Sequence, residues 1–253
     1  MPIKFIMPGQ MENEWFKDWF NTPYYHDLYF KRNETEANTF IRNLVSHLQL
    51  KNGARVLDLA CGKGRHAVEL YNQGLKVIGI DYSNYFITEA KQYENDNLHF
   101  YVQDMRQPYW INYFDVVVNL FTSFGYFKTQ REHITSLNNI KNSLKAGGIF
   151  VIDYLNVIKT EKQLIKEMSI TINNVDYLIK KEVTDTHFLK HIHIKDGDEN
   201  FNYSESVSKF GLDDFKLMFS KVGLEIVALF GNYKLEKFDD ELSDRLIIIA
   251  QKK

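Results

Sequence analysis

The feature that most constrains this chain is an alternation of short apolar runs with segments of helical periodicity. The apolar runs are rich in valine, isoleucine, leucine and phenylalanine, and they cover residues 55–59, 76–80, 98–102, 114–120 and 149–153. Helical segments lie between them near residues 64–73, 83–94 and 129–144. Nearly unbroken apolar runs are typical of strands that are covered on both faces. Because strand–helix–strand connections are right-handed, this order predicts a doubly wound, mostly parallel sheet.

The rhythm changes after Asp153. Four short alternating runs follow at 168–172, 175–183, 187–195 and 201–209, separated by Asn173-Asn174, Asp185 and Asp196-Gly197, which suit hairpin turns. We therefore predict an antiparallel β insertion. A helix is expected at 213–222, and two further strands at 224–230 and 245–250, with no helical period between these strands. The whole pattern predicts an α/β fold: a Rossmann-like, doubly wound, mostly parallel seven-stranded sheet with an antiparallel C-terminal strand.

The N-terminal part has a different character. Residues 12–29 are rich in aromatic side chains and predict short helical pieces, and residues 34–49 have a helical period. We expect an N-terminal helical cap over residues 1–50. The core would then comprise residues 51–156 and 211–253, with the β insertion at 157–210 over the acceptor side of the site.

Charge and cysteine content narrow the functional classes. The formal net charge of −2 argues against a broad nucleic-acid footprint. Cys61 is the single cysteine, so no internal disulfide is possible, which fits a reducing cytoplasm. The first twenty residues lack a secretory apolar run, and no stretch is long enough to span a membrane. Monomer and homodimer both remain open.

A glycine turn follows the first predicted strand, in the stretch VLDLACGKGRH at residues 56–66. Residues 62–67 formally match the dinucleotide fingerprint G-x-G-x-x-G/A. A glycine turn between a strand and a helix is expected to present free backbone N–H groups to a ligand. Asp81 ends the next strand, where its carboxylate could bind both hydroxyls of a ribose. A nicotinamide and an adenosyl cofactor are equally served by these residues.

Three features separate the two cofactors. Asp58 precedes the glycines, where a carboxylate would repel a pyrophosphate but would suit an ammonium or a sulfonium. Asp104 follows the third strand, where it could accept a hydrogen bond from an adenine amino group. The chain also ends in a predicted hairpin, whereas a dehydrogenase would continue with β-α units.

Together these residues resemble the class I S-adenosylmethionine-dependent methyltransferases, over roughly residues 51–155 and the C-terminal strands. The resemblance rests on five motifs in order: 58–64 (DLACGKG), Asp81, Asp104, 114–121 (FDVVVNLF) and 144–148 (LKAGG). Ala60 stands where many members have glycine, which is compatible with the loop provided that its φ is negative. The type is similar to small-molecule methyltransferases such as the glycine and amino-sugar N-methyltransferases and the tellurite-resistance type.

The resemblance implies S-adenosyl-L-methionine as cofactor and a set of residues that bind it. The set is Asp58, Ala60, Gly62, Gly64, Arg32, Asp81, Tyr82, Asp104, Met105, Asn119 and Phe121. Residues 25–29 (YHDLY) resemble a segment that caps the cofactor in such enzymes, with His26 in place of an aspartate. We take Tyr25, His26 and Tyr29 as candidates for groups that orient or deprotonate the acceptor, and residues 121–127 as a candidate acceptor wall.

The expected function is methyl transfer by in-line displacement to a nitrogen or oxygen atom of a small molecule. This reaction needs alignment and exclusion of water more than a catalytic triad. A non-catalytic binding or interaction module is the alternative, followed by an NAD-dependent dehydrogenase. His187, His191 and His193 share one strand face, yet no carboxylate is fixed near them by spacing, so we expect no metal.

Overall fold

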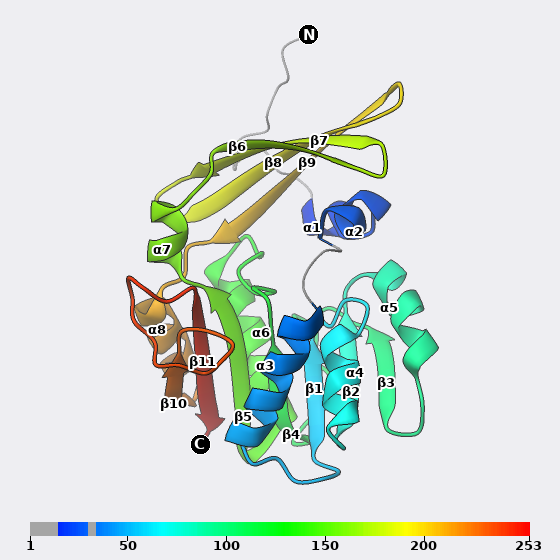
Figure 1. Ribbon diagram of the computed structural model, residues 1–253. Helices are drawn as coiled ribbons and strands as arrows, with labels where there is room; N and C mark the ends of the chain where they lie inside the picture. Colours follow the sequence, from blue (N-terminus) through cyan, green and yellow to red (C-terminus); the bar gives the residue numbers. More distant parts are fainter. Residues whose placement is uncertain (1–14, 30–33) are drawn as a thin grey trace.

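The computed structural model describes residues 15–29 and 34–253, and Figure 1 shows their arrangement. A seven-stranded sheet forms the core, with the strand order β10-β11-β5-β4-β1-β2-β3. Its strands are β1 (Arg55–Leu59), β2 (Lys76–Asp81), β3 (Leu98–Val102), β4 (Phe114–Asn119), β5 (Leu144–Leu155), β10 (Leu224–Phe230) and β11 (Arg245–Lys252). Only β11 runs antiparallel to its neighbours, β5 and β10. The predicted α/β fold, with its antiparallel C-terminal strand and terminal hairpin, is confirmed.

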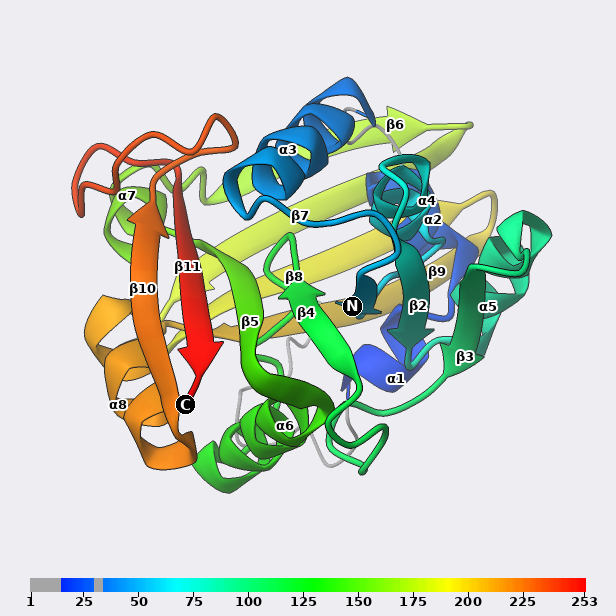
Figure 2. The same cartoon turned by 90° about the horizontal axis from the view of Figure 1, so that it is seen from below.

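Helices cover both faces of this sheet (Figure 2). One face is packed by α3 (Glu34–His47), α4 (Arg65–Asn72) and α5 (Asn84–Ala90), and the other by α6 (Gln130–Ser143) and α8 (Leu212–Val222). Amphipathic helices explain the packing: Phe40, Ile41 and Leu44 of α3 are fully buried, as are Phe215 and Phe219 of α8. A short 3-10 turn, Lys91–Tyr93, follows α5.

The β5 strand differs from its prediction at the N-terminal end. It begins at Leu144, because the LKAGG segment is part of the strand and not only a turn before it. The pairing with β4 breaks there, since Phe114 pairs with Leu144 while Val116 pairs with Ile149. Gly147 has a φ of +71°, which lets the strand bend at this break.

A second, four-stranded antiparallel sheet lies over one end of the core (Figure 1). It comprises β6 (Glu167–Ile172), β7 (Val175–Val183), β8 (His187–Asp196) and β9 (Glu199–Ser208), close to the predicted runs. The short helix α7 (Val157–Lys162), which the sequence did not reveal, leads into it from β5. The division of the chain into cap, core and insertion stays a prediction.

Two short N-terminal helices, α1 (Trp15–Trp19) and α2 (Pro23–Tyr29), lie between the two sheets. Trp19 has no exposed surface and packs in a small core with Val175, Tyr177, Ile192 and other side chains of the four-stranded sheet. The α1–α2 turn also touches the main core, because the Ser83 hydroxyl donates a hydrogen bond to Asn21 Oδ1 at 2.7 Å. Within the described ranges, no helix has the length and apolar character needed to cross a membrane.

Candidate active site

A cavity of about 310 Å³ opens at the carboxyl ends of β1, β2 and β4, next to α1 and α2. The strand order reverses between β1 and β4, and ligands of doubly wound sheets bind at this point. The cavity is lined by most of the residues that the sequence assigned to a site: Tyr25, His26, Tyr29, Asp58, Ala60, Gly62, Asp81, Tyr82, Asp104, Met105 and Phe121.

Two of the assigned residues lie outside the cavity wall. Gly64 precedes α4 with a φ of +83°, and a Cβ there would lie 2.7 Å from the Phe100 ring, so this glycine serves helix packing. Asn119 is buried at the end of β4 and donates from Nδ2 to the Leu59 carbonyl oxygen at 2.9 Å, which ties β4 to β1. Arg32 lies outside the described residues.

The amides of the glycine turn are used inside the protein. The Gly62 N–H donates to Asp81 Oδ2 at 2.9 Å, and the Gly64 N–H donates to the Cys61 carbonyl oxygen at 3.0 Å. The expectation that these two glycines present free N–H groups was therefore wrong. Their role is conformational, since both have a positive φ, and neither of these two amides is left for a pyrophosphate.

Ala60 also contradicts its expectation. Its φ is +61°, in the left-handed region, and not negative as expected for an alanine at this place. A left-handed alanine costs about 1–2 kcal/mol because its Cβ approaches the following carbonyl. The loop conformation is imposed by its surroundings: the Cys61 N–H donates to the Ile80 carbonyl, and Gly62 is held by Asp81.

Asp58 is the most buried acid of the cavity, with 1% of its surface exposed. Its Oδ2 atom has no hydrogen-bond partner within the part of the chain that the structure describes. Burial, followed by the nearby charge of Asp81, raises the pKa of Asp58 to about 7. A buried carboxylate with an unused oxygen fits a cationic ligand group, which would supply the missing hydrogen bond and charge.

Asp81 is held rigidly at the end of β2. One oxygen accepts from the Ser83 N–H at 2.8 Å and the other from the Gly62 N–H at 2.9 Å. Burial raises the pKa of this carboxyl above its ordinary value. Each oxygen keeps a second lone pair, so the carboxylate can still accept two hydroxyl hydrogen bonds. The cap of α5 is Ser83, whose hydroxyl accepts from the Phe86 N–H.

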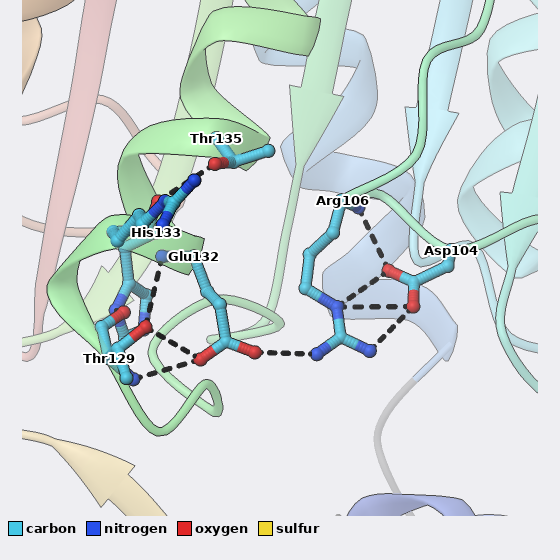
Figure 3. A network of polar contacts seen from close by, with 7 residues as sticks. Asp104, Arg106, Thr129, Glu132, His133 and Thr135 are labelled. Carbon is cyan, nitrogen blue, oxygen red and sulfur yellow. Dashed lines mark hydrogen bonds and ion pairs between the residues drawn. The ribbon is translucent and has the colours of Figure 1, made fainter.

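Asp104 belongs to a network that sequence reasoning missed (Figure 3). Arg106 donates to both of its carboxylate oxygens, from Nε at 3.1 Å to each and from Nη2 to Oδ2 at 2.6 Å. The same guanidinium donates from Nη1 to Glu132 at 2.8 Å, and Glu132 forms the capping box of α6 with Thr129. The cavity edge after β3 is thereby connected to the first turn of α6.

Phe121 follows β4, and its ring makes a stacking contact and a cation–π contact at the cavity. His66 stacks on its ring at 4.9 Å, so this histidine faces the cavity, and the Arg65 guanidinium lies 4.9 Å from the ring centroid. Phe121 and Thr122 both have a φ of +58°. Asp153 holds this turn, since its Oδ2 accepts from the Phe121 N–H at 2.8 Å while its Oδ1 pairs with Arg245 Nε at 2.7 Å.

The histidines of β8 are engaged in cross-strand contacts. His191 Nδ1 lies 3.0 Å from the Ser204 hydroxyl, and His193 Nδ1 lies 3.0 Å from Asn202 Oδ1. Among the described residues, no group of three or more histidine, cysteine, aspartate or glutamate side chains could hold a metal ion.

Most of the residues that the sequence did not reveal do not line the cavity but contact residues that do, or contact the partners of such residues. Arg106 stands two positions after Asp104, a spacing that could have suggested a local ion pair. Asp153 is the last residue of one apolar run, and Arg245 directly precedes another. The only sequence signal for a pair is that each charge adjoins an apolar run. Phe86 lines the cavity from α5 and had no signal beyond its apolar character.

The fold and the site together define a class of protein. Three acids lie at or close to the carboxyl ends of three adjacent strands of the sheet, and the most buried one has an oxygen left for a cation. The remaining lone pairs on the two Asp81 oxygens suit a ribose, and a reversed strand, β11, lies between β5 and β10. These features fit S-adenosylmethionine and define a class I S-adenosylmethionine-dependent methyltransferase.

Comparison with known proteins agrees. The chain belongs to the family described as "Methyltransferase domain", whose profile matches residues 50–207. It is 35% identical over 107 residues to the putative methyltransferase YqeM of Bacillus subtilis (strain 168), covering 41% of this chain and 43% of that protein. It is 27% identical over 237 residues to the glycine/sarcosine N-methyltransferase of Parasynechococcus marenigrum (strain WH8102), covering 87% and 78%.

A solved structure shares the fold over nearly the whole chain. The CcbJ methyltransferase from Streptomyces caelestis superposes with a TM-score of 0.76 at 17% identity, covering 95% of this chain and 99% of that one. The protein is an S-adenosylmethionine-dependent methyltransferase, and the resemblance inferred from its motifs is confirmed.

Proposed function

We propose that the protein methylates a nitrogen atom of a small molecule that binds between α2 and residues 121–127. The observation that carries this proposal is that the cap and the post-β4 loop wall the same cavity as the three acids. Relatives whose names specify glycine, sarcosine and an amino sugar as N-methylation substrates favour nitrogen over oxygen.

The residues of the chain have distinct tasks in this proposal. Asp58 would accept from the ammonium of the donor, Asp81 would accept from its ribose, and Asp104 would accept from its adenine. The bound donor supplies an electrophilic methyl group on a sulfonium. Phe20, Tyr25, Phe121 and Tyr126 wall the cavity. Such rings exclude water and present negative faces to a cation, which favours a charge-dispersing displacement.

Tyr25, His26 and Tyr29 are proposed to orient the acceptor. All three lie on α2 and line the cavity. Tyr25 and Tyr29 pack ring against ring with centroids 4.7 Å apart, which fixes both hydroxyl positions relative to the helix. The net charge of the chain is slightly negative and gives no support for a nucleic-acid acceptor. We propose a cytoplasmic location, which fits the single cysteine of the sequence, the buried Cys61.

The test combines binding and transfer. Calorimetry with S-adenosylhomocysteine measures cofactor binding. Incubation with methyl-labelled S-adenosylmethionine then uses two pools from a cell extract, molecules below about 1 kDa and total RNA. Label in an amine of the small-molecule pool is expected. Label in RNA alone would overturn the proposal. Binding of S-adenosylhomocysteine without any methyl transfer would also overturn it, and would favour a non-catalytic binding module.

Asp81→Ala provides the negative control. Loss of two hydrogen bonds to the ribose is expected to weaken S-adenosylhomocysteine binding by about 2–3 kcal/mol. Because Asp81 also holds Gly62 and Ser83, the melting temperature must be measured alongside the dissociation constant. An unchanged dissociation constant would remove Asp81 from the cofactor site.

A further inference from the structure

A polar cluster joins the cavity to the four-stranded sheet. Its centre is Glu205 of β9, whose Oε1 accepts from the Tyr29 hydroxyl at 2.6 Å and from Trp19 Nε1 at 2.7 Å. The second oxygen, Oε2, lies 2.9 Å from the same hydroxyl. Tyr29 lines the cavity, so the carboxylate stands directly behind a cavity side chain.

Lys190 of β8 completes the cluster. It lies opposite Glu205 in the β8–β9 pairing, and its Nζ is 3.6 Å from Glu205 Oε2. The ammonium donates to the Tyr29 hydroxyl oxygen and lies 4.4 Å from the Tyr29 ring centroid. The side chains of Glu205 and Lys190 are only 13% and 17% exposed, so both charges are held largely out of water.

This arrangement sets the direction of the Tyr29 hydroxyl. Its proton is directed to Glu205, because the hydroxyl donates to the carboxyl oxygens of this side chain. The phenol oxygen therefore acts as an acceptor toward its remaining neighbours, as it does toward Lys190. Because Tyr29 lines the cavity, an oxygen with its proton held in this way would suit an N–H group of a bound acceptor, which it would turn so that the nitrogen lone pair points away from Tyr29.

We propose that Glu205 is a positioning residue of the methyl-transfer site, acting through Tyr29 with Lys190. The four-stranded sheet is then part of the active site and does more than cover it. This inference rests on the proposed function, because it assigns the Tyr29 oxygen to an amine acceptor.

The chain offers a matched control for a purely structural role. Tyr24, on the same helix, donates from its hydroxyl to Asp196 Oδ2 of β8 at 2.9 Å. This pair also ties α2 to the four-stranded sheet, but Tyr24 is not among the residues that line the cavity. If Glu205 merely anchored α2, then Glu205→Gln and Asp196→Asn would have the same consequences.

The experiment compares Glu205→Gln with Asp196→Asn, using methyl-labelled S-adenosylmethionine and a dilution series of the small-molecule pool. Glu205→Gln is expected to lower the maximal rate at least tenfold, since misplaced reacting groups cost one to two orders of magnitude. The dissociation constant of S-adenosylhomocysteine should change less than about twofold, because Glu205 does not touch the three acids. Asp196→Asn should keep the maximal rate within about twofold.

A double-mutant cycle separates action through Tyr29 from loss of anchoring. In a Tyr29→Phe background, Glu205→Gln should lower the maximal rate no further, since the hydroxyl on which it acts is gone. Additive losses, or equal losses in Glu205→Gln and Asp196→Asn, would overturn the inference. If Glu205→Gln loses its cooperative thermal transition, Lys190→Met replaces it, and the cycle is measured with Lys190→Met and Tyr29→Phe.

The two proposals fail in different ways. If the wild type binds S-adenosylhomocysteine but labels nothing in the small-molecule pool, the proposed function fails. If the wild type labels an amine and Glu205→Gln labels it equally fast, the function stands and the role of Glu205 is refuted.

Discussion

Ala60 has a strained backbone conformation for a residue with a Cβ. It lies between β1 and the glycine turn with a φ of +61°. Ala60→Gly is expected to raise the free energy of unfolding by roughly 0.5–1 kcal/mol, since the left-handed strain exceeds the added entropy of an unfolded glycine. Urea denaturation measures this. Ala54→Gly, where φ is not positive, serves as control and should lower stability by a similar amount. A less stable Ala60→Gly variant would contradict the strain.

Asp58 predicts a pH dependence of cofactor binding. Its pKa of about 7 lies above the ordinary carboxyl value because of burial, so the free protein favours the protonated acid. The stability that this group contributes is present below the ordinary carboxyl pKa and is lost as the pH rises through about 7. A bound ammonium reverses the preference, because it favours the carboxylate.

The affinity for S-adenosylhomocysteine should therefore rise between pH 6 and pH 8, by up to about tenfold per unit below pH 7. Calorimetry across this range measures the effect, and buffers of different ionisation enthalpy count the released proton. Asp58→Asn should bind weakly with a flat profile. A flat wild-type profile would show that Asp58 does not meet the cationic group.

At the scale of elements, the network of Figure 3 links the end of β3 to the start of α6 through Arg106. If Asp104 receives the adenine amino group, Arg106→Lys should weaken S-adenosylhomocysteine binding by about tenfold, because a lysine cannot hold a carboxylate at two points. The binding of adenosine should weaken in parallel, which calorimetry can compare.

Lys145→Met is the control for this prediction. It removes the ion pair between Lys145 and Asp115. The side chains of these two residues are 40% and 36% exposed. Exposed pairs contribute about 0–1 kcal/mol, so binding should be unchanged. Equal binding by wild type and Arg106→Lys would show that Asp104 needs no support from Arg106.

At the scale of the whole molecule, Asp153 and Arg245 connect β5, β11 and the turn after β4. Asp153 is fully buried, pairs with Arg245, and also accepts from the Tyr233 hydroxyl at 3.1 Å. Replacing Arg245 by methionine leaves the carboxylate of Asp153 buried without its guanidinium, and replacing Asp153 by leucine leaves the guanidinium of Arg245, 20% exposed, without its carboxylate. Each change should cost about 3–5 kcal/mol in the free energy of unfolding.

The double variant Asp153→Leu/Arg245→Met should lose clearly less than the sum, because no lone charge remains. Urea denaturation of the four proteins completes the cycle. Strictly additive losses would show that the pair contributes through packing alone.

Local patterns predicted the elements well for a physical reason. The apolar runs of β1, β2 and β4 are largely buried, and the turn residues between β6, β7, β8 and β9 fix the strand ends within a few residues. The three acids were found because the carboxyl ends of parallel strands meet at one edge. What failed was backbone detail: the φ of Ala60, the internal use of the glycine amides, and the continuation of β5 through Gly147 depend on neighbours far along the chain.

The sequence by itself determined the α/β architecture, the methyl-donor class and the three acids that line the cavity, because periodicity and strand-end chemistry are local. The tertiary structure alone decided which side chains stand behind them. Tyr29 and Glu205 are 176 positions apart, and Arg245 lies 92 positions from Asp153. Such pairs have no spacing rule, since strand pairing within the core sheet brings Arg245 to Asp153, and the packing of α2 against the four-stranded sheet brings Tyr29 to Glu205.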